Sequence, residues 1–184
     1  MEIFETSIPE VKLFKPSVFD DARGSFFESY NLNTIKKAGI EATFVQDNQS
    51  FSSRGVLRGL HYQTGAHAQA KLVRVLQGEV LDIAVDVRKG SPTYGKYFSA
   101  ILSAENQKQM FVPRGFAHGF VVLSETATFF YKCDNFYNKE SEGGIVWNDP
   151  TIHVDWQMDK SLILLSEKDE ILPTLEHCKN DFIY

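Results

Sequence analysis

Short segments in which apolar and polar residues alternate dominate the chain, and they predict β-strands. Residues 71–76 (KLVRVL) alternate, Gln77-Gly78 interrupts the pattern, and residues 80–87 (VLDIAVDV) carry apolar side chains at every second position. Further strands are predicted within residues 96–102, 110–124 and 127–137. Turn residues such as Ser91-Pro92 and Tyr94-Gly95 separate several of these segments. The pattern therefore predicts many short strands.

Only one stretch is typical of a helix. Asn31 can cap its start, apolar residues recur at Leu32, Ile35 and Ala38, and Gly39 supplies a stop. The 15 Phe, seven Tyr and two Trp suit packed sheet faces. Many strands with few short helices predict an all-β sandwich or barrel. Without an internal repeat or linker, residues 1–184 are expected to form a single domain, with the segment after Glu170 wrapping around the outside.

Composition and charge exclude several classes of protein. Of the 184 residues 43% are hydrophobic and 23% are charged, which is typical of a globular chain with a core. The net charge of −5 predicts no nucleic-acid surface, so the positive charges that bind an anionic ligand must be local. The sequence has no apolar run of the roughly 18–20 residues that cross a bilayer. The first residues do not have the pattern of a signal peptide. Two cysteines, Cys133 and Cys178, are too few for a disulfide framework. A cytoplasmic location is therefore predicted.

Residues 54–63 (RGVLRGLHYQ) contain the first candidate chemistry. Gly55 and Gly59 are expected to bracket a strand that presents Arg58 and His61. Histidine has an unperturbed pKa of about 6.5 and therefore moves protons well near neutral pH. A single histidine is more often structural than catalytic, and a lysine such as Lys71 is more often a charge at a strand edge. Both interpretations stay open on these residues alone.

Residues 113–120 (PRGFAHGF) resemble the second motif of the cupin superfamily, in which a histidine often binds a metal ion. The first cupin motif has His-x-His followed by a glutamate, whereas this chain has His61-Tyr62-Gln63. His67 is the only other nearby imidazole, and it lies in a sequence typical of a turn. Three or four metal ligands cannot be assembled from these residues. We therefore expect a cupin-like barrel without a metal site, whose pocket histidines transfer protons.

The chain as a whole resembles the dTDP-4-dehydrorhamnose 3,5-epimerase family. The resemblance rests on long segments, among them DARGSFFESYN, FVQDNQSFSSRGVLRGLHYQ, HAQAKLVRVLQGEVLDIAVDVRKGSPTYGKY, PRGFAHGFVVLSETA, YKCDNFY, EGGIVWNDPTI and LSEKD. It implies a cupin-type jelly roll, an isomerase that needs neither metal nor organic cofactor, and a homodimer. It also implies a nucleotide-sugar substrate in dTDP-L-rhamnose biosynthesis.

The resemblance also implies a role for each matching residue. His61 corresponds to the general base, Tyr131 to the general acid, and Asp169 to the carboxylate that orients the base. Lys71 and His118 correspond to residues beside the sugar, and Lys71 would face the enolate oxygen. The expected nucleotide-sugar contacts are Arg23, Phe26, Glu28, Gln46, Asp47, Asn48, Arg58, Glu142, Lys168 and Tyr137, the last by stacking on thymine.

The absence of phosphate-binding loops agrees with this interpretation. Neither G-x-x-x-x-G-K-[ST] nor G-x-G-x-x-G occurs, so a nicotinamide-dependent epimerase is disfavoured. Arg23, Arg58 and Lys168 can instead supply local positive charge for a diphosphate. The chain departs from the common family pattern at Thr64-Gly65-Ala66, at Arg114 and at Gln157, which are loop or turn positions.

Two other functions remain open at this level. A single-centre epimerase, acting at C3 or C5 only, would share nearly all of these residues. A sugar-nucleotide binding module without turnover would require that His61, Asp169 or Tyr131 be lost, and all three are present. The sequence also leaves open the strictness for thymidine. The N-terminal segment around Pro9 and Pro16 is a candidate for an edge strand exchanged within a dimer.

Overall fold

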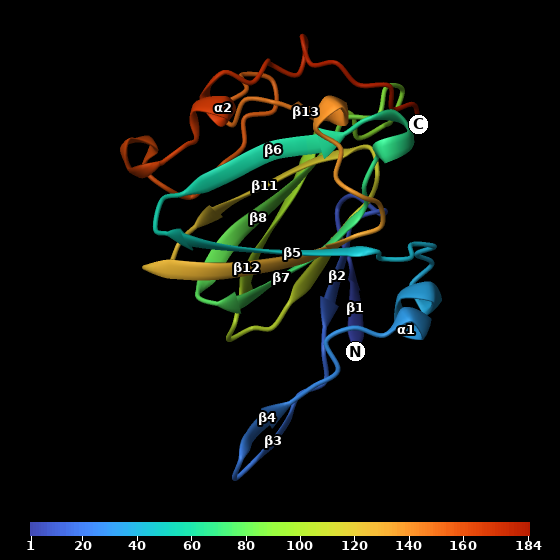
Figure 1. The fold of residues 1–184 in the computed structure, drawn as a ribbon, viewed down its shortest axis with the longest axis vertical. Coiled ribbons are helices and arrows are strands. Elements are labelled where there is room, and N and C mark those ends of the chain that lie inside the picture. The colour runs from blue at the N-terminus through green and yellow to red at the C-terminus, as the bar shows by residue number, and fades with distance from the viewer.

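Two antiparallel β-sheets pack face to face in the computed structural model, which describes residues 1–184 (Figure 1). The first sheet has six strands in the order β1 (Glu2–Glu5), β2 (Lys12–Lys15), β10 (Gln109–Val112), β7 (Lys71–Gln77), β12 (Thr126–Cys133) and β5 (Gln46–Ser53). The second has five in the order β13 (Glu142–Gly144), β6 (Leu57–Gln63), β11 (Phe116–Val122), β8 (Glu79–Asp86) and β9 (Tyr97–Ser103). The predicted all-β sandwich of jelly-roll type is confirmed.

The helices are few and short, as predicted. In α1 (Leu32–Lys37) the Asn31 side chain accepts a hydrogen bond from the Asn33 backbone N–H, and Ile35 is buried. The second helix, α2 (Glu167–Glu170), was not predicted, because one turn of helix has no detectable periodicity. Three short 3₁₀ segments complete the set, namely η1 (Gly65–His67), η2 (Lys139–Ser141) and η3 (Lys160–Leu162). None of the helices has the length and apolar character that crossing a bilayer requires.

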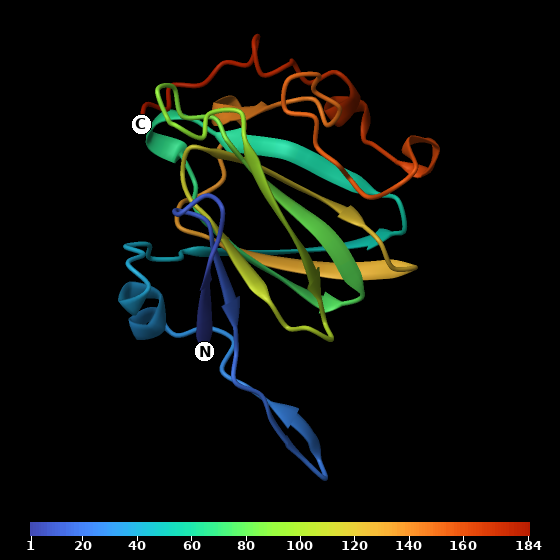
Figure 2. The ribbon, with the colours of Figure 1, turned by 180° about the vertical axis from the view of Figure 1, so that it is seen from behind.

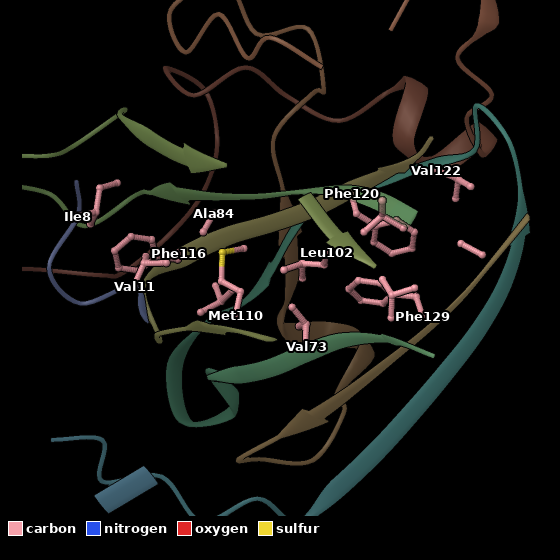
Figure 3. Packing of buried hydrophobic residues seen from close by; sticks show 14 residues of the cluster. Ile8, Val11, Val73, Ala84, Leu102, Met110, Phe116, Phe120, Val122 and Phe129 are labelled. Carbon is pink, nitrogen blue, oxygen red and sulfur yellow. The ribbon is translucent and has the colours of Figure 1, made fainter. Parts of the chain in front are cut away.

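The main hydrophobic core lies between the two sheets. Figure 3 shows its side chains filling this space, with Met110 and Leu102 near its centre. Phe120 from β11 and Phe129 from β12 stack across the sheets with ring centroids 4.1 Å apart. Stacked aromatic rings add stabilisation beyond the burial of their area. This pair therefore fixes the spacing of the sheets beside the cavity described below.

The outer face of the second sheet is covered by the chain that follows β13, as Figures 1 and 2 show. Ile152, Trp156 and Leu175 from this segment pack on the sheet. Residues 171–184 run over the outside as predicted, and Ile183 makes a parallel bridge to Lys89. Because this layer covers one face and the first sheet covers the other, seven of the eight residues of β8 are buried.

The sequence predicted that Gly55 and Gly59 bracket a strand. Gly59 instead lies within β6, so the prediction is wrong for the position of Gly59. The φ angle of Gly59 is +135°, and a Cβ atom there would lie 2.5 Å from the Cα atom of Gly119 on β11. Glycine is thus required by the close approach of two backbones. The strand continues through it to His61.

A two-stranded hairpin, β3 (Phe19–Asp21) and β4 (Gly24–Phe26), projects from the barrel (Figures 1 and 2). Phe19 and Phe26 are 67% and 72% exposed. Exposed aromatic side chains on a protruding element are typical of an interaction site. Nearby, β1 forms the edge of the first sheet and pairs with β2 of the same chain, so strand exchange there stays a prediction.

Candidate active site

A cavity of about 610 Å³ opens between the two sheets, at the end next to α2. Strands β6 and β11 of one sheet, β5, β7 and β12 of the other, and α2 contribute its walls. Eight of the predicted site residues line it, namely Asn48, Arg58, His61, Lys71, His118, Tyr131, Lys168 and Asp169. Residues separated by more than 100 positions in sequence thus meet in one cavity.

His61 and Asp169 form a close pair at this cavity. His61 Nε2 lies 2.6 Å from Asp169 Oδ1, and the carboxylate is 2% exposed. Burial alone raises the pKa of Asp169, but the hydrogen bonds from His61, Gly59 N–H and Ser166 outweigh it and hold that pKa below its usual range. An ionised carboxylate only accepts hydrogen bonds, so Nε2 carries the hydrogen and Nδ1 is left for a ligand.

α2 places Asp169 in this position. The Ser166 side chain caps the helix by accepting a hydrogen bond from the Asp169 backbone N–H at 3.2 Å. The Gly59 backbone N–H also approaches Asp169 Oδ2 at 3.4 Å. The carboxylate is therefore held by its own helix and by the strand that carries His61.

His118, which lines the cavity, forms a second histidine–carboxylate pair with the fully buried Asp82. His118 stands opposite His61 in the β11–β6 register, and its Nε2 lies 3.0 Å from Asp82 Oδ1. Burial lowers the pKa of His118 and raises the pKa of Asp82. Burial also lowers the pKa of Lys71, although the negative charge of Asp82 acts in the opposite direction. These groups form a compact polar cluster in a largely apolar surrounding.

Tyr131 lies on β12, in the sheet that faces His61. Burial raises its pKa to about 12, so the phenol stays protonated at neutral pH. Lys71 Nζ lies 5.8 Å from the centre of its ring. One cavity thus contains a histidine from one sheet and a neutral phenol and a lysine from the other.

Two cations line the cavity near α2. Arg58 Nε donates a hydrogen bond to Ser52 Oγ at 3.2 Å, so one side of its guanidinium is held while the rest is free. Lys168 Nζ lies 2.7 Å from Glu142 Oε2, which joins α2 to β13. Arginine and lysine at a cavity mouth suit a phosphate group. The predicted local positive charge is therefore present, apart from Arg23.

Seven predicted site residues do not line the cavity of their own chain, namely Arg23, Phe26, Glu28, Gln46, Asp47, Tyr137 and Glu142. Arg23 and Phe26 lie on the projecting β3–β4 hairpin. Asp47 pairs with Lys132 at 2.9 Å, and Gln46 Oε1 accepts a hydrogen bond from the Tyr137 backbone N–H at 3.0 Å. Alternation along β5 places Asp47 on the opposite face from Asn48, whereas Gln46 shares the face of Asn48 and donates a hydrogen bond to its Oδ1 at 3.1 Å.

Three residues in or around the cavity were not predicted to support the site. Ser166 had the signal of a cap three residues before an acidic residue. Asp82 interrupts an apolar strand, and a buried carboxylate normally needs a partner. Gln63 stands where the first cupin motif has a histidine, and its amide donates hydrogen bonds to the backbone of two loops.

Across the chain, no three His, Cys, Asp or Glu side chains are grouped so that they could hold a metal ion. The departure Arg114 pairs with Asp134 at 2.9 Å, outside the cavity.

This arrangement suits proton transfer at a carbon beside a carbonyl group. Such chemistry needs a base with a free lone pair, a proton donor and a positive charge near the oxygen that becomes negative. Nδ1 of His61, the phenol of Tyr131 and the ammonium group of Lys71 have these properties and line one cavity. Arg58 and Lys168 add a place for an anionic group.

Comparison with known proteins agrees with this geometry. The family model described as dTDP-4-dehydrorhamnose 3,5-epimerase matches residues 5–177. A relative of that name from Pseudomonas aeruginosa is 56% identical over 92% of this chain and 93% of its own. The crystal structure of such an epimerase from Elizabethkingia anophelis has a TM-score of 0.92 and 54% identity, and covers 96% of this chain and 97% of its own.

A second solved structure contains a ligand. It is a dTDP-6-deoxy-D-glucose-3,5-epimerase from Legionella pneumophila in complex with dTDP-4-keto-L-rhamnose. It is 47% identical, has a TM-score of 0.92, and the match covers 96% of this chain and 93% of that one. With the match of the family model over nearly the whole chain, these similarities show that the chain belongs to the dTDP-4-dehydrorhamnose 3,5-epimerase family.

Proposed function

We propose that this chain inverts C3 and C5 of dTDP-4-dehydro-6-deoxy-D-glucose to form dTDP-4-dehydro-L-rhamnose. The observation that carries the proposal is the shared cavity of His61 and Tyr131, which come from opposite sheets. Inversion at a carbon needs a base on one side and an acid on the other. The family membership gives the substrate its identity.

In the first step His61 Nδ1 takes the proton from C3 or C5. Both carbons are adjacent to the C4 carbonyl, so the electron pair of the broken C–H bond moves into an enolate. Asp169 stabilises the imidazolium that forms, because its carboxylate is bonded to Nε2. Lys71 faces the developing charge on the enolate oxygen, a kind of contact typically worth about 3–4 kcal/mol.

In the second step Tyr131 returns a proton to the same carbon from the opposite side. A C–H bond forms as the phenol O–H bond breaks, and the enolate returns to the ketone. His61 has then gained a proton and Tyr131 has lost one, so exchange with water must reset both before the next inversion. The raised pKa of Tyr131 keeps the phenol protonated at the start of each cycle.

Recognition of the nucleotide requires more than one chain. Arg58 and Lys168 are the cavity's own cations for the diphosphate, whereas Arg23 and Phe26 lie on a hairpin that projects away from the barrel (Figure 1). We propose a homodimer in which this hairpin of each chain reaches the cavity of the other. The exposure of Phe19 and Phe26 supports this assembly.

Two smaller proposals complete the assignment. Residues 1–184 act as one domain, because both sheets and α2 contribute walls to the same cavity. The protein is cytoplasmic, which is supported by its similarity to epimerases that act on a nucleotide sugar. Fractionation of the cells that make it would test the second proposal.

Solvent-deuterium incorporation into the substrate tests the function. The 4-keto substrate is incubated with the protein in D₂O, and NMR measures the label at each carbon. Deuterium at both C3 and C5, with L-rhamnose formed after a 4-keto reductase is added, is expected. Label at only one carbon would indicate a single-centre epimerase. No label, with dTDP still bound, would contradict catalysis and leave a binding module.

A further inference from the structure

The loop that follows β12 carries Tyr137, whose side chain is 55% exposed. The backbone of this loop is held by Gln63, the last residue of β6, which is only 5% exposed. Gln63 Nε2 donates hydrogen bonds to Phe136 O at 3.2 Å and to His67 O at 2.7 Å. Gln63 Oε1 accepts one from the Asn138 backbone N–H at 2.7 Å. One buried amide is thus hydrogen-bonded to the residues on both sides of Tyr137.

A second glutamine holds Tyr137 itself. Gln46 Oε1 accepts a hydrogen bond from the Tyr137 backbone N–H at 3.0 Å, and Gln46 Nε2 donates to Asn48 Oδ1. Gln46 belongs to β5 and Gln63 to β6, so the loop is fixed from both sheets. Three consecutive residues of the loop therefore each have a backbone group bonded to a glutamine side chain.

The start of the loop is tied down in the same way. Gln69 Nε2 donates to Asn135 O at 2.8 Å, and Asn135 Nδ2 donates to Ala66 O at 2.8 Å. Asp134 Oδ1 accepts a hydrogen bond from the Ala70 backbone N–H at 2.7 Å. Loops are usually mobile, and one whose backbone is bonded at almost every residue is ordered before a ligand arrives.

The chemistry of glutamine explains its presence at position 63. An amide has two N–H donors and an acceptor oxygen, whereas a neutral imidazole has one donor and one acceptor. Two carbonyls and one N–H of the surrounding loops need partners at this point. A histidine at the place where cupins bind metal could not satisfy all three.

We propose that Gln63 is a positioning residue for nucleobase recognition. It fixes the backbone around Tyr137, so the ring is in place for stacking before the nucleotide binds. This inference rests on the proposed function, in which Tyr137 stacks on the thymine. Since the ordering of the loop is completed during folding, it does not weaken binding.

Gln63→Met tests the proposal, with Tyr62→Phe as its matched control. Tyr62 is the neighbouring residue of β6, is also 5% exposed, and donates from its hydroxyl to Lys179 O at 3.1 Å. The control therefore loses a hydrogen bond from a buried side chain to a backbone carbonyl away from the loop. We expect faster amide hydrogen exchange in residues 135–138 for Gln63→Met and unchanged exchange there for Tyr62→Phe.

Binding measurements then connect the loop to the base. For Gln63→Met we expect about tenfold weaker binding of dTDP, as for partial loss of a stacked base, and unchanged binding of pyrophosphate, which has no base. The kcat should be nearly unchanged while KM rises.

A double-mutant cycle decides the matter. In a Tyr137→Ala background, Gln63→Met should weaken dTDP binding no further, because the positioned ring is already gone. Additive effects, or equal weakening for pyrophosphate, would overturn the role of Gln63. If Tyr137→Ala binds dTDP like the wild type, the stacking role and this inference both fail. Deuterium entry at C3 and C5 of the substrate would still show that the epimerase assignment holds.

Discussion

The cavity and the β3–β4 hairpin carry predicted site residues in opposite ways. In the cavity, His61, His118 and Tyr131 lie on strands of the two packed sheets, and buried carboxylates hold the two histidines. On the hairpin, the side chain of Arg23 pairs only with Asp21, two residues away. The proposed reacting groups are thus ordered within one chain, whereas the hairpin residues do not line the cavity of their own chain.

This difference separates chemistry from recognition. Proton transfer is sensitive to small displacements, and residues on packed strands are well placed to provide that precision. A projecting hairpin can contribute binding contacts without disturbing those distances. We therefore expect changes in the cavity to affect kcat, and changes on the hairpin to affect KM.

The largest effect is expected for His61→Asn. Asparagine keeps a polar side chain at this position, but its amide cannot take a proton near neutral pH. We expect kcat to fall by about a thousandfold, with deuterium entry lost at both C3 and C5. The affinity for dTDP, measured by calorimetry, should be nearly unchanged. Wild-type turnover in this variant would rule out His61 as the base.

A smaller effect is expected for Arg23→Ala combined with Phe26→Ser. Loss of the cation and the ring should raise KM about tenfold and change kcat little. Light scattering should show particles of twice the 20.9 kDa chain mass. A monomeric wild type would contradict the exchange of hairpins between chains.

Mixed dimers sharpen this prediction. When the hairpin variant is mixed with His61→Asn, each mixed dimer has one cavity with an intact histidine and an intact hairpin from the other chain. At low substrate concentration, activity should recover to about a quarter of wild type, since half of the dimers are mixed and each has one complete site. If the hairpin served its own chain, mixing would restore nothing.

The smallest effect concerns the pH dependence of Tyr131. Its pKa of about 12 in the folded protein exceeds the value of about 10 for an unfolded tyrosine. The folded state therefore retains the proton while the unfolded state loses it, and Tyr131 reduces stability as pH rises from about 10 to 12. Tyr131→Phe should lose less stability than the wild type in this range, as measured by urea unfolding. An ultraviolet titration of the wild type, from which that of Tyr131→Phe is subtracted, should show the Tyr131 phenol ionising at about pH 12. A midpoint near 10 would contradict its burial.

Local patterns predicted most strands because a short strand needs only alternation and a turn at each end. The same reasoning failed at Gly59, which it took for a strand boundary. Glycine is needed there because the backbone of Gly119, on another strand, lies too close for a Cβ atom. It also missed that Asp82 would be buried, because alternation assigns residues to two faces without telling which face is covered. Here the chain after β13 covers one and the first sheet covers the other.

The sequence predicted the site residues as a set, but it did not predict which of them line the cavity of their own chain. Motif resemblance named His61, Tyr131 and Asp169, and the structure brings all three to one cavity. Nothing local in the sequence places Arg23 outside that cavity, because the direction of a hairpin depends on contacts beyond it. Gln63 was noticed only as a missing metal ligand, since its hydrogen-bond partners lie on loops distant in sequence.

The position of Asp169 along the chain has a consequence for biosynthesis. The strands that carry His61, Lys71, His118 and Tyr131 are complete once β13 ends at Gly144, but α2 comes later. A nascent chain that has emerged only as far as β13 has His61 without the carboxylate that is bonded to its Nε2. The cavity therefore gains the carboxylate that orients His61 only after α2 has been synthesised. Proteolysis between β13 and α2 that released the segment carrying α2 would return it to that unfinished state.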